Sequence, residues 1–189
     1  MSNSWRVLNV TIFRQIIRRR GVSVKGNTYF IAHERSVVEE IEMEICLICY
    51  DFTSERFGLR LPLPFHSYCS QKDSIVVSTV REEKLAVLFK RCDAYEMEIW
   101  ITTKIEPNAV SWNNLFKVDL MFEIGIVRGS FLVDENEKAA VIFDENTENR
   151  ANYKAYIIGE KGDNKEVDLG EYQRWSHVYS YVPSRVQIQ

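Results

Sequence analysis

The chain lacks the long apolar runs that mark membrane and secreted proteins. No stretch approaches the roughly 20 consecutive apolar residues that a helix needs to span a bilayer. The N-terminus shows no apolar core followed by a small-residue cleavage site, so it does not resemble a secretory signal peptide. We therefore expect a cytoplasmic or nuclear protein whose four cysteines stay reduced, namely Cys46, Cys49, Cys69 and Cys92.

Motifs that carry catalysis or cofactor binding are also missing. The sequence contains no G-x-S-x-G, no phosphate-cradling glycine loop and no H-E-x-x-H. Its three histidines, His33, His66 and His177, lie far apart and belong to no ligand or nucleophile pattern. The sequence therefore predicts a protein that is not an enzyme and takes no cofactor, and it nominates no catalytic or cofactor-binding residue.

One cysteine pair has the spacing of a metal site. Cys46 and Cys49 are three residues apart within a run that reads as a strand, where such positions face opposite sides of the sheet. No second pair completes a zinc-ligand set. We expect no metal site and interpret both cysteines as small buried apolar residues.

The net charge is only −3, which gives no global field that would attract nucleic acid or an anionic membrane. We therefore expect neither as a partner. With 46% apolar and 12% aromatic residues, the chain is also far from the composition of a disordered protein. Its 189 residues are enough for one domain with a real core, so residues 1–189 are interpreted as a single domain.

The stretch 83–120 contains the pattern on which the rest of the chain is built. Residues 84–89 are apolar on both faces, which is typical of a strand covered on both sides. Residues 95–102 alternate, with Met97, Ile99 and Ile101 on one side and Glu98 and Trp100 on the other, which is the signature of a half-buried strand. After the turn signal at 106–108, residues 116–120 alternate again.

The same three-strand pattern occurs twice more. Downstream it covers 138–143, 153–159 and 165–169, and upstream it covers 27–32, 44–52 and 57–63. A further strand precedes each trio, at 21–24, 74–80 and 129–133. The offsets of about 50–57 residues fall in the range of propeller blades. The fold class predicted is therefore all-β: a partial, open β-propeller of about three four-stranded antiparallel blades.

This pattern leaves little room for helix, at most short pieces around 12–19 and 37–42. We interpret 66–72 as a loop, and we expect Trp5 and Trp112, at equivalent places in the repeat, to pack between blades. The residues expected in the core are Leu85, Val87, Phe89, Ile99, Val141, Phe143 and Ile157.

The ends of the chain bear on closure of the ring. Residues 4–8 resemble the last strand of an earlier blade, and 177–188 would form a final strand with which they could pair. Three blades are fewer than complete propellers have, so apolar blade faces should be uncovered at both ends unless that pairing forms. Without the pairing we expect self-association or a requirement for a partner.

Six segments carry a family resemblance. They occur in the order 21–29, 51–58, 61–65, 98–106, 154–159 and 181–184. Together they resemble the plant F-box-associated domain, type 1, over nearly the whole chain. The resemblance implies kelch-like propeller repeats and a role in recruiting substrates to SCF-type ubiquitin ligases.

The resemblance covers only the C-terminal half of a family member. No F-box segment precedes Trp5, so we expect that this chain does not bind a Skp1-type adaptor directly. The function predicted is a non-catalytic protein-interaction module that binds a target protein through loop tips, with no particular contact residue nominated. Two alternatives are a propeller that binds a small ligand or sugar, and a non-functional fragment of a truncated F-box gene.

Overall fold

The computed structural model describes residues 15–17, 21–34, 42–65, 68–70, 73–120, 124, 130–145, 152–162 and 164–171. Within these residues the chain forms strands and no helix, as the alternating apolar pattern predicts. The strands are β1 (Gln15–Ile17), β2 (Val22–Val24), β3 (Asn27–Glu34), β4 (Glu42–Asp51), β5 (Arg56–Phe57), β6 (Tyr68–Ser70), β7 (Ser74–Val80), β8 (Lys84–Lys90), β9 (Glu96–Glu106), β10 (Ala109–Asp119), β11 (Ser130–Asp134), β12 (Ala139–Glu145), β13 (Asn152–Gly159) and β14 (Asn164–Glu171).

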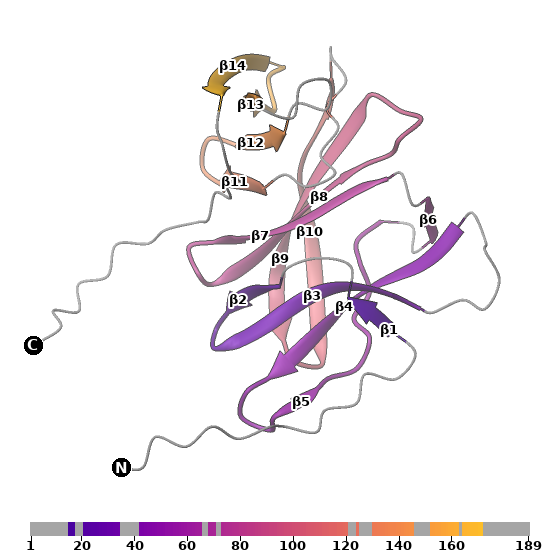
Figure 1. The fold of residues 1–189 in the computed structure, drawn as a ribbon. Helices are drawn as coiled ribbons and strands as arrows, with labels where there is room; N and C mark the ends of the chain where they lie inside the picture. The colour runs from indigo at the N-terminus through magenta and orange to yellow at the C-terminus, as the bar shows by residue number, and fades with distance from the viewer. Residues whose placement is uncertain are drawn as a thin grey trace, which may run out of the picture.

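The strands form three antiparallel sheets, seen one above another in Figure 1. The second and third sheets are four-stranded meanders, β7-β8-β9-β10 and β11-β12-β13-β14. In the first sheet six strands fill four positions, because β1 and β2 pair with one edge of β3 while β5 and β6 pair with the far edge of β4. All three sheets therefore share one four-position plan.

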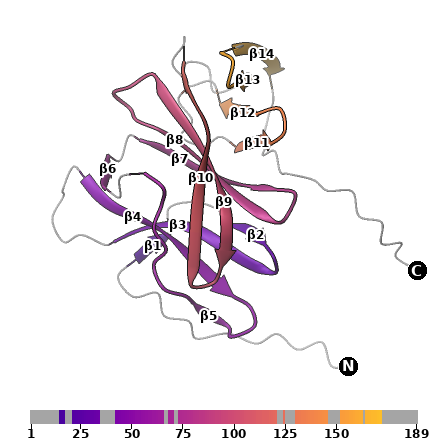
Figure 2. The ribbon, with the colours of Figure 1, turned by 180° about the vertical axis from the view of Figure 1, so that it is seen from behind.

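The second sheet lies between the other two. Its first strand, β7, contacts both β2 and β11, so the leading strands of the three sheets lie side by side. Ser78 of β7 donates a buried 2.6 Å hydrogen bond from Oγ to the carbonyl oxygen of Phe131 in β11. From this line of leading strands the sheets extend outward as propeller blades do (Figures 1 and 2).

Two apolar clusters fill the spaces between the sheets. The cluster between the first and second sheets includes Tyr29, Leu47, Leu85 and Phe89. The cluster between the second and third sheets is built from Ala86, Leu88, Met97, Ile99, Phe131, Ile142, Tyr156 and Ile158, among others. Strand β8 contributes to both clusters, which explains why its sequence is apolar on both faces. Each fully buried Leu, Ile, Met or Phe side chain contributes about 1.5–3 kcal/mol to the free energy of folding.

Most of the predicted core is confirmed in the second sheet. Leu85, Val87 and Ile99 are fully buried and Phe89 nearly so. The predicted alternation of β9 is also confirmed, because Met97, Ile99 and Ile101 all pack toward the third sheet.

In the third sheet the predicted core face is wrong. Val141 and Phe143 are only partly buried and Ile157 is 39% exposed, whereas Ala140, Ile142, Tyr156 and Ile158 are buried instead. The cause is a difference in turn length. Three residues separate the paired Val80 and Lys84, but four separate Asp134 and Ala139. The sequence-based alignment of the repeats omitted this extra residue, so it displaced β12 by one position. A displacement of one residue in a strand assigns every side chain to the opposite face.

Three further predictions about elements need correction. Gln15–Ile17 is a strand paired with β3 rather than part of a short helix, and Tyr68–Ser70 is a strand rather than a loop. The strand expected at 57–63 is only Arg56–Phe57, followed by an isolated bridge between Leu47 and Leu61. Proline at 62 and 64 cannot donate to a ladder, which agrees with the early end of this strand. The predicted strands at 4–8 and 177–188 lie outside the described residues.

Candidate interaction surface

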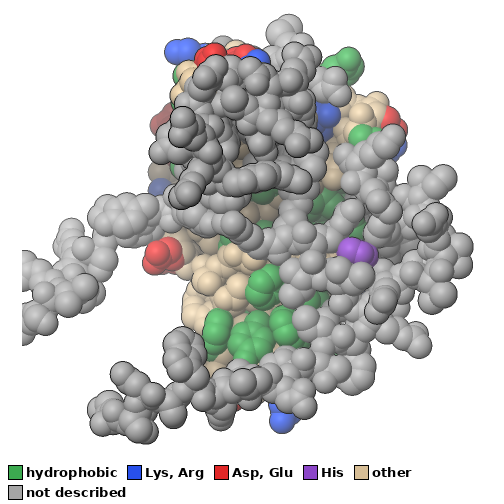
Figure 3. Space-filling model, viewed as in Figure 1, with side chains coloured by type: hydrophobic (Ala, Val, Ile, Leu, Met, Phe, Trp, Pro, Cys, Tyr) green, Lys and Arg blue, Asp and Glu red, His purple; other side chains and the backbone are tan. Residues whose placement is uncertain are grey.

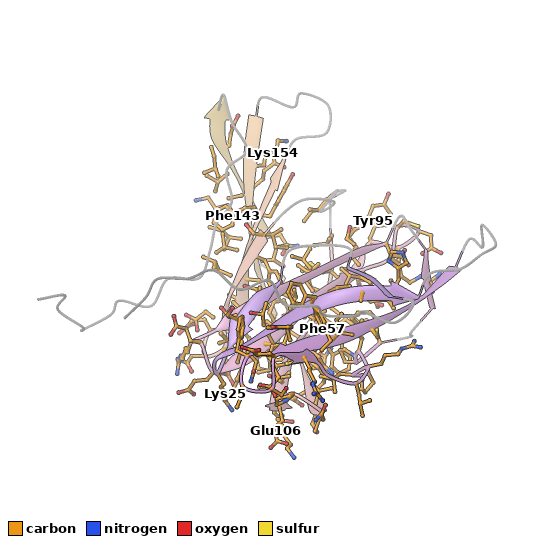
Figure 4. All side chains as sticks on the ribbon, turned by 60° about the horizontal axis from the view of Figure 1, so that its bottom comes forward. Lys25, Phe57, Tyr95, Glu106, Phe143 and Lys154 are labelled. Atoms are coloured by element: carbon orange, nitrogen blue, oxygen red, sulfur yellow. The ribbon has the colours of Figure 1, made fainter. Side chains whose placement is uncertain are left out.

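Six turns gather at one end of the three sheets, and we call this surface the turn end. In an antiparallel meander the first and third connections lie at the same end, and this holds in each sheet. The turns occupy 25–26, 52–55, 81–83, 107–108, 135–138 and 160–162. The turns β2–β3, β7–β8 and β11–β12 lie along the left side of Figure 1. In Figure 4, Lys25 and Glu106 lie at one edge of the molecule, well away from Tyr95.

The backbone of these turns fixes which way the side chains point. Lys25 and Gly26 both have positive φ, 49° and 76°, the combination that a two-residue type I′ hairpin turn requires. Arg81 and Glu82 in the next sheet have φ of 52° and 58°. Left-handed backbone at residues with a Cβ costs roughly 1–2 kcal/mol each, so the flanking strands must hold these turns in place. Their side chains are exposed to solvent.

Carboxylates stabilise two of the turns from within. Asp51 accepts hydrogen bonds from the Thr53 N–H and the Ser54 hydroxyl, both at 2.8 Å. These bonds, the one from Ser54 first, hold the pKa of Asp51 below its ordinary value. Asp134 accepts from the N–H groups of Asn136 and Glu137 at 2.9 and 3.2 Å. Both turns therefore have a defined shape before any partner binds.

Ion pairs connect neighbouring parts of the turn end. Lys84 of the second sheet and Glu135 of the third lie 2.6 Å apart, with their side chains 37% and 28% exposed. Lys138 and Glu160 connect the two turns of the third sheet at 2.6 Å. Exposed pairs of this kind contribute at most about 1 kcal/mol, so their main effect is to fix the relative positions of the turns. Both signs of charge are interspersed over this surface, so it favours no partner of uniform charge.

The tip of the β9–β10 hairpin is fastened to the first sheet. Trp112 donates from Nε1 to the carbonyl oxygen of Pro62 at 3.0 Å, and its ring packs against the cluster between the first and second sheets. Gly58 lies so close to the tip that a Cβ there would approach the carbonyl oxygen of Pro107 to 2.7 Å. The interpretation of Trp112 as a packing residue is confirmed, while Trp5 lies outside the described residues.

Among the described residues, those weighed for metal chemistry do not come together. Cys46 packs with Ala32 and Ile48 on one face of the first sheet, and Cys49 packs on the other face, so the two thiols face apart as predicted. His33 lies within β3, while His66 and His177 fall outside the described residues. Over the described part of the chain, no three His, Cys, Asp or Glu side chains form a group that could hold a metal ion. No helix among those residues is long and apolar enough to cross a membrane.

The turn end was not predicted as a surface from the sequence. Of its six turns, the signal at 106–108 was predicted from its residues, and the structure has a turn at 107–108. Consecutive hairpins in a four-stranded meander place alternate turns at one end, and this signal was present in the strand order.

Stacked antiparallel meanders with their leading strands side by side define the class of this protein as a partial β-propeller. Within that class, the chain matches the sequence model of the F-box associated beta propeller domain over residues 1–188. The chain belongs to this family.

Its curated relatives are F-box proteins of Arabidopsis thaliana. Putative F-box protein At3g19560 is 55% identical, with the match covering 100% of this chain and 52% of the relative. F-box/kelch-repeat protein At3g16740 is 47% identical over 99% of this chain and 52% of the relative. F-box protein At3g17320 is 45% identical over 99% of this chain and 51% of the relative. The chain thus spans about half the length of the curated relatives that it matches.

Proposed function

We propose that this chain recruits a target protein to an SCF-type ubiquitin ligase, and that the turn end is the contact surface. The role is binding alone, and other subunits of the ligase carry out the transfer of ubiquitin. Family membership and the names of the F-box relatives support this role. The observation that supports the choice of surface is the set of six exposed turns held in defined shapes at one end of a rigid stack.

The physical argument rests on preorganisation. A surface whose turns already have their bound shape loses less conformational entropy when a partner docks. Rigid sheets can also carry turns of different sequence without loss of the fold, which is how one scaffold serves many targets. We place this activity in the cytoplasm or nucleus, where SCF-type ligases would meet their targets.

Two arginines give a matched test of the surface. Arg81 precedes β8 at the turn end, and Arg91 follows β8 at the opposite end; both are exposed. Arg81→Glu and Arg91→Glu change the net charge equally. The immobilised chain and both variants are each incubated with Arabidopsis extract, and the bound proteins are quantified.

We expect a defined set of proteins that the original chain and Arg91→Glu retain equally, and that Arg81→Glu retains several-fold less. Loss with Arg91→Glu alone would place the contact at the opposite end. No specifically retained protein with any of the three chains would contradict target binding itself.

The role in ubiquitination has its own test. An F-box segment is fused ahead of this chain, and a protein recovered above is incubated with the reconstituted ligase. We expect ubiquitin transfer to that protein with the original chain and reduced transfer with Arg81→Glu. Binding without transfer would support an interaction module that acts outside the ligase.

A further inference from the structure

The third sheet has an apolar outer face that no described residue of another sheet covers. This face, which we call the third outer face, points away from the second sheet. Cross-strand register aligns Leu132, Val141 and Ile157 in one row, and Phe143, Ala155 and Val167 in the next. Ile157 is 39% exposed, and Leu169, two residues beyond Val167 in β14, is 51% exposed. Side chains of this kind normally lie between packed sheets.

The first sheet has a corresponding outer face, the first outer face, at the other end of the stack. Ala32, Cys46 and Ile48 form its floor, and Phe30 and Phe57 pack against them. Tyr50 lies edge-on to both Phe52 and Phe57, with ring centroids 4.9 and 5.1 Å apart, and Phe52 is 58% exposed. Figure 3 shows hydrophobic side chains gathered on the lower half of the molecule, over the first sheet.

The middle sheet shows what such faces are for. One face of β8, with Leu85 and Val87, packs on the preceding sheet, and the other face, with Ala86 and Leu88, packs on the following sheet. The second residue of the second strand faces the preceding sheet in both cases. This residue is Leu85 in the second sheet and Ala140 in the third. Each sheet therefore has one face for a predecessor and one for a successor.

The two outer faces are complementary under this rule. In the first sheet the equivalent strand begins at Asn27, and Thr28 and Phe30 lie on its predecessor side, which is the first outer face. In the third sheet Val141 and Phe143 lie on the successor side, which is the third outer face. Within the chain, the successor face of one sheet packs on the predecessor face of the next sheet. A third outer face packed on a first outer face would make the same kind of contact.

We propose that a second copy of this chain covers both faces. The first outer face of each copy packs on the third outer face of the other, so that two chains of three sheets close a six-bladed ring. Six lies within the usual range of four to eight blades. The two contacts are identical and related by a two-fold axis, so assembly stops at the dimer. The surfaces that meet are sheet faces, so the turn end stays free in both copies except at the 52–55 turn, where Phe52 lies at the edge of the first outer face.

The test uses exposed positions so that the variants fold. Ile157→Glu places a carboxylate on the third outer face, and Phe52→Lys places an ammonium group at the edge of the first outer face. Tyr95→Glu is the control, since Tyr95 is 66% exposed in the connection between β8 and β9, away from both faces. Far-ultraviolet circular dichroism and thermal melting verify the fold, and sedimentation equilibrium at 1–100 μM (roughly the concentration range of weak to moderate affinities) measures the mass.

We expect the original chain and Tyr95→Glu to sediment at twice the 22.2 kDa chain mass. We expect Ile157→Glu and Phe52→Lys, each alone, to shift toward the monomer by at least tenfold in dissociation constant. An equimolar mixture of these two variants should recover a heterodimer, because one contact then joins two unaltered faces and the other joins Glu to Lys. Only a contact between unlike faces gives this recovery.

Three results would overturn the proposal. A monomer across the whole concentration range that does not bind apolar dyes would mean that the chain's own remaining residues cover the faces. Mass that grows with concentration beyond two chains would show an open assembly rather than a closed ring. A dimer that neither variant weakens would place the contact elsewhere on the molecule.

Discussion

At the scale of single residues, Phe89 should be sensitive to truncation. Its ring stacks on Phe65 with centroids 4.1 Å apart and planes 6° from parallel, within the cluster between the first and second sheets. Phe89→Ala should lower the free energy of unfolding by about 3–5 kcal/mol through lost burial and the cavity left behind. That is a large share of the roughly 5–15 kcal/mol that a domain has.

Urea denaturation measures this change, and Leu59→Ala is the control. Leu59 is 71% exposed, so its truncation should change stability by no more than about 0.5 kcal/mol. Equal effects of the two substitutions would show that Phe89 is not part of the core.

Tyr29 should make the protein sensitive to alkaline pH. Its side chain is only 1% exposed, and burial, followed by the nearby Cys49, raises its pKa far above the ordinary value of about 10. Below that value both the folded and the unfolded chain keep the phenolic proton. As the pH rises above it, the unfolded chain releases this proton while the folded chain retains it, so stability falls with rising pH.

Tyr29→Phe removes the phenolic hydroxyl, so this residue no longer releases a proton when the chain unfolds. We follow the free energy of unfolding between pH 9 and 11.5, a window around the unperturbed tyrosine pKa of roughly 10. In Tyr29→Phe this free energy should fall less steeply with pH, because up to one proton fewer is released on unfolding. Tyr95→Phe, at a 66% exposed position, should leave the slope unchanged. An identical slope for the original chain and Tyr29→Phe would contradict the assignment.

The sequence could predict single residues where one physical rule decided the outcome. Period-2 geometry alone was enough to place Cys46 and Cys49 on opposite faces. It was not enough for Val141 and Ile157, because both faces of a blade are apolar, so hydrophobicity cannot tell which one lies inward. The face is determined by the length of the first turn, which has four residues in the third sheet and three in the second. The length of this turn is known only once the pairing of its two strands is known.

At the scale of elements, β9 depends on a side chain to complete its pairing with β8. The buried Thr102 hydroxyl accepts the Leu85 N–H at 2.9 Å, in the place where a ladder carbonyl would otherwise be expected. Beyond this point the β9–β10 register shifts between Ser111 and Trp112. The hydroxyl therefore lets the long hairpin bulge without an unpaired N–H in the core.

Thr102→Val keeps the shape of this side chain and removes the acceptor. The buried Leu85 N–H then loses its partner, which should cost about 1–3 kcal/mol. Thr103→Val is the matched control, because the adjacent Thr103 is exposed. Chemical denaturation of the two variants in parallel should show the difference, and similar stabilities would mean that water or the backbone replaces the hydroxyl.

Long alternating elements were predicted well, and two of the three-residue strands were not. The pattern around Met97 to Ile101 covers several periods, and such strict alternation is typical of a half-buried strand. Gln15–Ile17 and Tyr68–Ser70 are each three residues long, which is too short for a period to be measured. Both exist because a neighbouring strand, β3 or β4, offers an unpaired edge, and that is a tertiary cause.

At the scale of the whole molecule, the repeat predicted the fold, but it did not predict the candidate site. Repeated trios of strands at about 50–57 residues sufficed for three stacked blades. The surface proposed for target binding is built from turns of all three sheets, such as Lys25, Arg81 and Lys138. These residues share no motif, since the strand order alone brings them to one end.

The polypeptide of residues 1–189, taken by itself, should not bind a Skp1-type adaptor. The family resemblance implies that adaptor binding resides in a separate helical F-box. In the part of the chain that the structure describes, all regular structure is strand and belongs to the three propeller sheets. Isothermal titration calorimetry of the purified polypeptide against the adaptor should therefore show no heat of binding at micromolar concentrations. The same polypeptide fused behind an F-box segment is the positive control and should bind, while Arg81→Glu in the fusion should leave that affinity unchanged because the turn end takes no part in it. Micromolar binding by the unfused polypeptide would assign adaptor recognition to the propeller itself and separate this chain from the division of labour proposed for its family.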